Sequence, residues 1–211
     1  HNCAVVRRHA PFSRVLAVVK ADAYGSGLVQ VAQALPDADG FGVATFDEAM
    51  ALRSAGITQP ILLMEGVLSP AELQGAAQQR LDIVVHQEWQ LEWLRTTTLA
   101  APLVVWLKVD TGMHRLGLPA DKVVQAWQSL QGLSQVSEIR LMSHLACADE
   151  RDHPLNAQQC QSFAALLEAA GATTASFANS AAILRGADFH YQWVRPGLML
   201  YGASPLLAAS A

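Results

Sequence analysis

Short apolar runs rich in β-branched residues recur along the chain at intervals of roughly 25 residues, the spacing of successive strand–helix units. Most of these runs are nearly continuous rather than alternating, which is typical of strands buried on both faces of a parallel sheet. The runs predict strands at residues 15–20, 40–45, 60–65, 82–86, 103–110, 140–145, 174–180 and 193–198.

Segments with helical character separate these runs. Asp47 and the Ser69-Pro70 pair, with Glu72 close behind, are residues that favour the start of a helix. The segments predict helices at residues 27–35, 47–55, 69–78, 87–96, 120–130 and 155–170, and a further helix at residues 2–8.

Strands and helices that alternate in this way predict an α/β protein, a closed (β/α)8 barrel of the TIM type. A flavodoxin-like open sheet is the alternative, although it needs fewer strands and more connecting chain. We assign residues 1–202 to the barrel and expect residues 203–211, which are small and apolar, to begin a truncated linker. The chain starts within a helical pattern, so we expect its beginning to be a truncation as well.

The composition narrows the classes of function. The 211 residues carry a net charge of −4 and only 15% charged residues, whereas a soluble domain usually has about a quarter. This mild acidity argues against nucleic acid, since phosphate binding needs a surplus of Lys and Arg on one face. The apolar runs are far shorter than the roughly 20 residues that cross a bilayer. The three cysteines form no CxxC unit, which favours a reduced, cytoplasmic protein.

In a TIM barrel the catalytic groups lie at the carboxyl ends of the strands. Lys20 ends the first predicted strand, after four apolar residues, and Tyr24 follows in a turn with Gly25 and Gly27. A lysine in the barrel mouth suits Schiff-base chemistry with a carbonyl, because burial favours the neutral amine. The alternative is a lysine that reaches solvent. The turn after it could hold a phosphate or could simply join strand to helix.

The last predicted strands end in groups that suit an anion. Asn179-Ser180 offers a hydroxyl and helix amides, and Arg195-Pro196-Gly197-Leu198 offers a guanidinium and further amides. Phosphate sites recur after strands 7 and 8 of this fold, although Ser180 could be a plain helix cap and Arg195 a solvated arginine. Together with Lys20 these groups indicate pyridoxal phosphate, lying across the mouth with its aldehyde at the lysine.

His144, at the end of the predicted strand over 140–145, is a candidate proton carrier or hydrogen-bond relay, or else a satisfied core histidine. His144, Cys147, Asp149 and His153 have no recognised ligand spacing, so we expect no metal site. The sequence also contains no P-loop, G-x-G-x-x-G or G-x-S-x-G motif.

Five blocks, in order along nearly the whole chain, resemble the signature motifs of alanine racemases, which are fold-type III pyridoxal-phosphate enzymes. The first contains Lys20 and Tyr24 within Ala-Val-Val-Lys-Ala-Asp-Ala-Tyr-Gly, and the second contains Lys108 and Arg115. The blocks are residues 17–25, 107–117, 142–144, 178–182 and 194–202.

The resemblance implies that Lys20 binds pyridoxal 5′-phosphate covalently and acts as one of two bases, on the D-alanine face. Arg195 would face the pyridine nitrogen and leave it unprotonated, because an arginine does not readily give up its proton. An unprotonated ring withdraws electrons from the substrate less strongly, and this favours proton exchange at Cα over transamination. The other residues that it implies for cofactor binding are Tyr24, Asn179, Ser180, Gly197 and Leu198, with Tyr24, Ser180 and the amides of Gly197 and Leu198 on the phosphate.

Three further roles come from the resemblance. Arg115 would approach the cofactor phenolate and the substrate carboxylate. His144 would link Arg195 to the second base. Lys108 matches a position that is carbamylated in some members of the family, where the carbamate orients the arginine.

The second base is where this sequence departs from the family. There it is a tyrosine on a C-terminal β-domain, delivered from the other subunit of a head-to-tail homodimer. We expect that β-domain to be absent here, and neither Tyr191 nor Tyr201 to replace the tyrosine. The sequence therefore predicts the cofactor domain of an alanine racemase, which interconverts L- and D-alanine for peptidoglycan, and a chain that is inactive or impaired alone.

Two other functions stay open. One is a barrel that binds pyridoxal phosphate without catalysis, although its motifs would differ from Ala21-Asp22-Ala23-Tyr24. The other is a racemase of the same fold that acts on another amino acid, since a methyl-sized pocket discriminates by only about 1–3 kcal/mol. A structural or interaction module is less well supported. The low charge suggests exposed apolar surface on this chain, but a β-domain and a second subunit that cover it would account for that surface.

Overall fold

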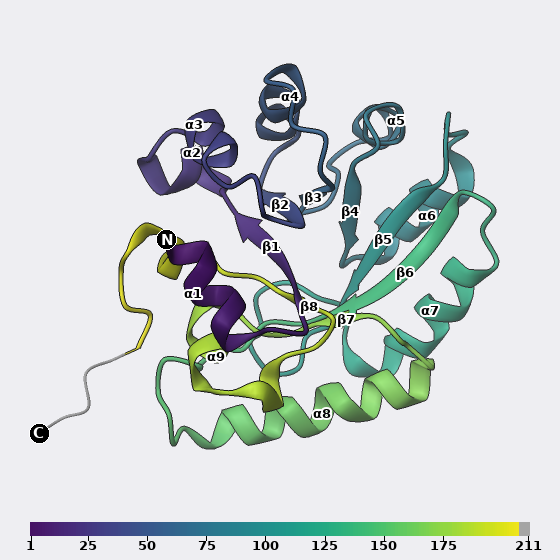
Figure 1. The fold of residues 1–211 in the computed structure, drawn as a ribbon. Helices are drawn as coiled ribbons and strands as arrows, with labels where there is room; N and C mark the ends of the chain where they lie inside the picture. Colours follow the sequence, from purple (N-terminus) through teal and green to yellow (C-terminus); the bar gives the residue numbers. More distant parts are fainter. Residues whose placement is uncertain (207–211) are drawn as a thin grey trace, which may run out of the picture.

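The computed structural model describes residues 1–206, in which eight parallel strands close a barrel in sequence order (Figure 1). The last strand pairs with the first, Arg14 lying opposite Trp193. This confirms the closed (β/α)8 barrel and excludes the open sheet. The strands are β1 (Arg14–Val18), β2 (Gly40–Val43), β3 (Ile61–Leu63), β4 (Asp82–Val85), β5 (Leu103–Lys108), β6 (Val136–Met142), β7 (Ala175–Ser176) and β8 (Trp193–Val194).

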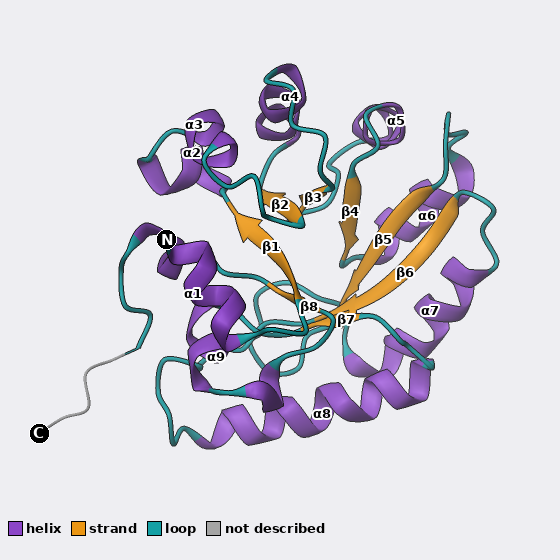
Figure 2. Ribbon diagram, in the orientation of Figure 1, coloured by secondary structure: helices purple, strands orange, loops and turns teal. Residues whose placement is uncertain are grey.

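Helices follow the strands and cover the outside of the barrel (Figure 2). Within residues 1–206 none is long and apolar enough to span a membrane. They are α1 (Asn2–His9), α2 (Lys20–Gly25), α3 (Leu28–Gln33), α4 (Phe46–Ser54), α5 (Pro70–Gln78), α6 (Glu88–Thr96), α7 (Val123–Gln131), α8 (Pro154–Ala170) and α9 (Ser180–Arg185), with 3-10 turns η1 (Ala120–Lys122), η2 (Ala187–Phe189) and η3 (Leu198–Tyr201).

The apolar runs bury both of their faces, as the sequence predicts. One face of each strand packs against the surrounding helices in a large outer core, and the other fills the barrel interior. The interior cluster consists of Leu16, Leu62, Val84, Trp106, Met142 and Trp193.

The amino-terminal end of the barrel is closed by a charged and aromatic cluster. The guanidinium of Arg140 lies 5.0 Å from the ring centre of Trp106 and 5.1 Å from that of Trp193. Its Nη1 is 3.2 Å from the buried Asp82 carboxylate, to which the Trp106 indole also donates. This cluster fills the amino-terminal end of the barrel interior.

Several element boundaries differ from the predicted ones. β1 ends at Val18, so Lys20 follows the strand instead of ending it. β6 begins at Val136 and not at residue 140. β7 covers only two residues, and Ser180 begins α9. The cap of α4 is Thr45, whose side chain accepts from the Glu48 amide, whereas Asp47 lies in the first turn.

Lys20 opens a turn with an uncommon backbone. Ala21, Asp22, Ala23 and Tyr24 all have left-handed dihedral angles, with φ between 52° and 56°. L-residues pay roughly 1 kcal/mol or more each for this conformation. The Asp22 carboxylate accepts from the Leu28 amide at 2.8 Å, and the Asp22 amide donates to Glu48 at 3.3 Å. These bonds hold a turn that the local sequence does not favour, between Lys20 and Tyr24.

Candidate active site

A cavity of about 440 Å³ opens at the carboxyl ends of the strands. It brings together every site residue that the sequence predicts, from five different strand ends and the loops after them. These are Lys20, Tyr24, Lys108, Arg115, His144, Asn179, Ser180, Arg195, Gly197 and Leu198. The sequence did not single out Met64, Glu65 and Met142, which line the same cavity.

Lys20 is half-buried, with its side chain 33% exposed, and its Nζ lies 3.7 Å from Glu65 Oε1. The sequence places Lys20 in the barrel mouth, with a lysine that reaches solvent as the alternative, and the turn after β1 puts it on the cavity wall, partly exposed. Glu65 directly follows Met64 after β3. The rule that points to Lys20 would also have pointed to Glu65, since it ends the predicted strand over 60–65.

Arg195 forms the floor of the cavity and is 3% exposed. Its Nη1 donates to Ser176 Oγ at 2.6 Å and its Nη2 to the Ser143 carbonyl oxygen at 2.6 Å. Burial, and then the positive charge of Arg115, lower its pKa to about 10, so it stays protonated at neutral pH. Its Nε is buried and has no hydrogen-bond partner among residues 1–206. A buried donor of this kind costs free energy until an acceptor is supplied.

His144 lies beside this guanidinium, with Nδ1 3.4 Å from Arg195 Nη2. Loss of solvent, followed by the positive charges of Arg195 and Arg115, lowers the pKa of His144 well below its usual value. The imidazole is therefore neutral at physiological pH and can accept a hydrogen bond from Arg195.

Tyr24, Ser180 and Gly197 form one end of the cavity. A Cβ atom on Gly197 would lie 2.5 Å from the Tyr24 hydroxyl, so only glycine lets this phenol approach the backbone. Ser180 Oγ accepts from the Gly197 amide at 2.9 Å. The cap of α9 is Asn179, whose side chain accepts from Ala182 at 3.1 Å, and Ser180 is therefore not the cap.

Lys108, the last residue of β5, is buried on the cavity wall. Burial, and then the charges of Arg195 and Arg115, lower its pKa to about 8. Arg115 reaches the cavity from the loop after β5, where Asp110 Oδ1 accepts from the amides of Gly112, Met113 and His114 at 2.9–3.1 Å. The turn that presents Arg115 is thus organised by one carboxylate.

The cavity carries an excess of positive charge. Four cationic side chains line it, against the two carboxylates of Glu65 and Asp149. Such a site favours an anionic ligand. It combines an amine that can attack a carbonyl, a buried guanidinium donor and a hydroxyl-lined end, which are the groups that a phosphorylated aldehyde requires.

The sequence model described as "Alanine racemase, N-terminal domain" matches residues 1–205 of this chain. The chain belongs to that family. Its members are pyridoxal-phosphate-dependent racemases, which agrees with the resemblance that the five sequence blocks indicate.

Similar proteins cover nearly all of this chain. The alanine racemase of Halorhodospira halophila is 46% identical over 208 residues, which are 98% of this chain and 57% of that protein. That of Nitrosococcus oceani is 49% identical over 206 residues, 97% of this chain and 57% of that protein. The chain therefore spans less than two thirds of the length of these curated relatives.

Solved structures of the family share the barrel. The biosynthetic alanine racemase of Pseudomonas aeruginosa superposes with a TM-score of 0.95 at 45% identity, covering 100% of this chain and 59% of that one. The structure of the alanine racemase of Bartonella henselae contains covalently bound pyridoxal phosphate. It superposes with a TM-score of 0.85 at 30% identity, covering 97% of this chain and 60% of that one.

Proposed function

We propose that this chain binds pyridoxal 5′-phosphate covalently through Lys20 and forms the cofactor-bearing part of an alanine racemase. The unpartnered Nε of Arg195 is the observation that carries the proposal. It is a buried, charged donor on the cavity floor, and a neutral pyridine nitrogen is an acceptor of the matching kind. When bound, the cofactor supplies an electron sink for the Cα–H bond of an amino acid.

Arg195 is suited to hold that nitrogen unprotonated. A guanidinium with a pKa of about 10 donates a hydrogen bond at neutral pH but does not transfer its proton to pyridine. An acidic partner such as an aspartic acid would protonate the ring and strengthen the sink. Arg195 therefore favours exchange of a single proton at Cα over transamination.

The two ends of the cavity suit the two anions of the complex. Tyr24, Ser180 and the amides near Gly197 and Leu198 would hold the phosphate, and Asn179 fixes the start of α9 beside them. Arg115 would bind the carboxylate of the amino acid. In each assignment an N–H or O–H group donates to an ionised oxygen of the ligand. Hydrogen bonds to an ionised group are stronger than those between two neutral groups.

Lys20 Nζ would remove and return the Cα proton on the D-alanine face. The amine lies 3.7 Å from the Glu65 carboxylate. His144 accepts from Arg195 and would connect it to the second base, which the family resemblance assigns to a tyrosine of a partner subunit.

Lys108 would carry a carbamate in this proposal. Its pKa of about 8 leaves part of the amine neutral, the form that adds carbon dioxide. The adduct converts a buried cation into an anion, so the charges of Arg115 and Arg195 would attract it instead of repelling it.

The wider setting follows from the family resemblance. We propose a cytoplasmic homodimer that supplies D-alanine for peptidoglycan, with the second base reaching each cavity from the other subunit. The 211-residue chain alone would then exchange the Cα proton of D-alanine without inverting the carbon.

Incubation with D-alanine in heavy water tests this proposal. The chain loaded with pyridoxal 5′-phosphate should incorporate deuterium at Cα, measured by proton NMR, while chiral chromatography finds little L-alanine. Lys20→Ala should abolish the exchange.

The other outcomes separate the alternative functions. Cofactor binding without exchange of any amino acid would indicate a binding protein without catalysis. Exchange of another D-amino acid in preference to D-alanine would indicate a racemase of different specificity. Rapid formation of L-alanine by the chain alone would contradict the one-base assignment.

A further inference from the structure

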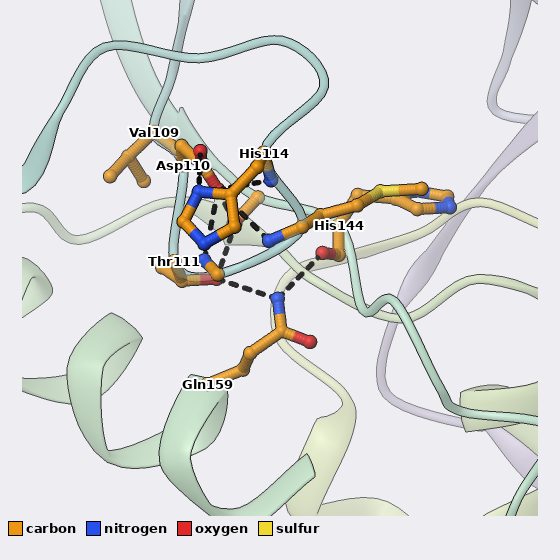
Figure 3. A network of polar contacts seen from close by, with 9 residues as sticks. Val109, Asp110, Thr111, His114, His144 and Gln159 are labelled. Atoms are coloured by element: carbon orange, nitrogen blue, oxygen red, sulfur yellow. Dashed lines mark hydrogen bonds and ion pairs between the residues drawn. The ribbon is translucent and has the colours of Figure 1, made fainter. Parts of the chain in front are cut away.

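Gln159 is a fully buried amide on α8 whose hydrogen bonds all go to the loops that carry the cavity residues. Its Nε2 donates to Thr111 Oγ1 and to the His144 carbonyl oxygen, both at 3.0 Å (Figure 3). Its Oε1 accepts from the Ala146 amide at 2.9 Å. A buried amide is tolerated only when its polar atoms are paired. Here the pairing joins the loop after β5 to the segment after β6.

The orientation of this amide is fixed by its neighbours. The His144 carbonyl oxygen can only accept and the Ala146 amide can only donate, so Nε2 must face His144 and Oε1 must face Ala146. A swapped amide would place like groups against each other at both contacts.

A directed chain of hydrogen bonds runs on from Gln159. Ser143 Oγ donates to the Val109 carbonyl oxygen at 2.8 Å, which uses its only hydrogen. It must then accept from Thr111 Oγ1 at 2.9 Å, and Thr111 in turn accepts from Gln159. Each hydrogen donated along this series of bonds goes to one acceptor, so replacing one member leaves a polar atom of its neighbour unpaired.

The segment that Gln159 supports is the one against which Arg195 rests. Arg195 Nη2 donates to the Ser143 carbonyl oxygen and lies 3.4 Å from His144 Nδ1. The Ser143–His144 backbone is thus held by Arg195 on one side and by Gln159 on the other. Thr111, the second contact of Gln159, precedes the turn that presents Arg115.

We propose that Gln159 is a positioning residue of the cavity, which fixes the spacing between the Arg115 loop and the Ser143–His144 segment and so directs Arg195 Nε toward the cofactor ring. This inference rests on the proposed function. It predicts that loss of the amide changes both the affinity for the cofactor and the orientation of the bound ring.

Gln159→Met tests the inference, because it keeps the length of the side chain and removes its hydrogen bonds. We expect the affinity for pyridoxal 5′-phosphate to fall about tenfold, as for one unpaired buried polar group. We also expect an altered visible circular dichroism per bound cofactor, with occupancy counted by borohydride reduction. Wild-type protein is measured first, and if its Lys20 captures no cofactor the proposed function itself fails.

Asn156→Leu is the matched control. Asn156 lies one turn earlier on α8 and is also buried, and its Nδ2 donates to the carbonyl oxygens of Cys147 at 3.0 Å and Glu150 at 2.8 Å. Its loss should lower the melting temperature and leave the cofactor signal per bound molecule unchanged. If both variants melt earlier but keep wild-type affinity and circular dichroism, Gln159 has only a structural role and the inference is wrong.

A second pair of variants decides the matter if Gln159→Met does not fold. Thr111→Val keeps the shape and removes the hydroxyl from the chain, whereas Thr111→Ser retains it. We expect the first to show the altered cofactor signal and the second to resemble wild type. A wild-type signal from a folded Thr111→Val variant would overturn the inference.

Discussion

At the scale of single residues, the cavity is shaped by positive charges held close together. Lys108 is buried near Arg115 and Arg195, and its pKa falls to about 8 as a result. In the unfolded chain the same amine titrates near 10.5. Below pH 8 the folded protein therefore carries a buried charge that opposes folding.

Lys108→Met should stabilise the chain at neutral pH by an amount on the order of 3 kcal/mol. Between pH 8 and 10.5 the unfolded wild type binds a proton that the folded state has lost, so wild-type stability rises and the difference shrinks. Urea unfolding of both proteins at pH 7, 9 and 10 measures this. A difference that does not change with pH would show that the buried charge is not its cause.

Bicarbonate at pH 8 should stabilise wild type alone if Lys108 forms a carbamate.

Most of the site could be predicted from the sequence because its residues follow strands that are easily recognised. Arg195 and Lys20 are found by the rule that barrel chemistry lies at the carboxyl ends of strands. Gln159 could not be found in this way, since it lies on a helix and acts through hydrogen bonds to two distant loops. Glu65 ends a predicted strand and was accessible to the same rule.

At the scale of elements, the eight strands could be predicted because strands buried on both faces leave continuous apolar runs. The turn from Ala21 to Tyr24 could not, because its left-handed backbone opposes the local preference of alanine and is imposed by contacts with Leu28 and Glu48. This turn joins Lys20 to Tyr24, the two residues after β1 that the proposed chemistry uses.

Ala21→Gly should relieve this strain and stabilise the chain by about 0.5–1 kcal/mol, because glycine adopts a positive φ without steric cost. Ala164→Gly is the matched control, an exposed alanine inside the right-handed helix α8. It should cost about 0.5–1 kcal/mol. Thermal unfolding of both variants measures the contrast, and equal destabilisation would mean that the turn is not strained in solution.

At the scale of the whole molecule, the two ends of the barrel differ: one is filled by packed side chains, and the other holds the cavity with the predicted site residues. Arg140, Asp82 and two tryptophans fill the amino-terminal end, and the predicted site residues meet in the cavity at the carboxyl-terminal end. The family resemblance adds a partner subunit over this cavity, which sequence and cavity geometry alone do not specify. The proposed dimer and second base rest on that resemblance.

Covalent capture of pyridoxal 5′-phosphate tests the central claim most directly, and the sequence makes it simple because it contains only three lysines, Lys20, Lys108 and Lys122. Wild type and the control Lys122→Ala should develop a visible absorption band on addition of the cofactor. Borohydride should fix the label on the peptide containing Lys20, as mass spectrometry would show. Lys20→Ala, checked for folding by circular dichroism, should develop no such band. A folded Lys20→Ala protein that binds the cofactor as wild type does, or a label fixed on Lys108, would contradict the assignment of the site.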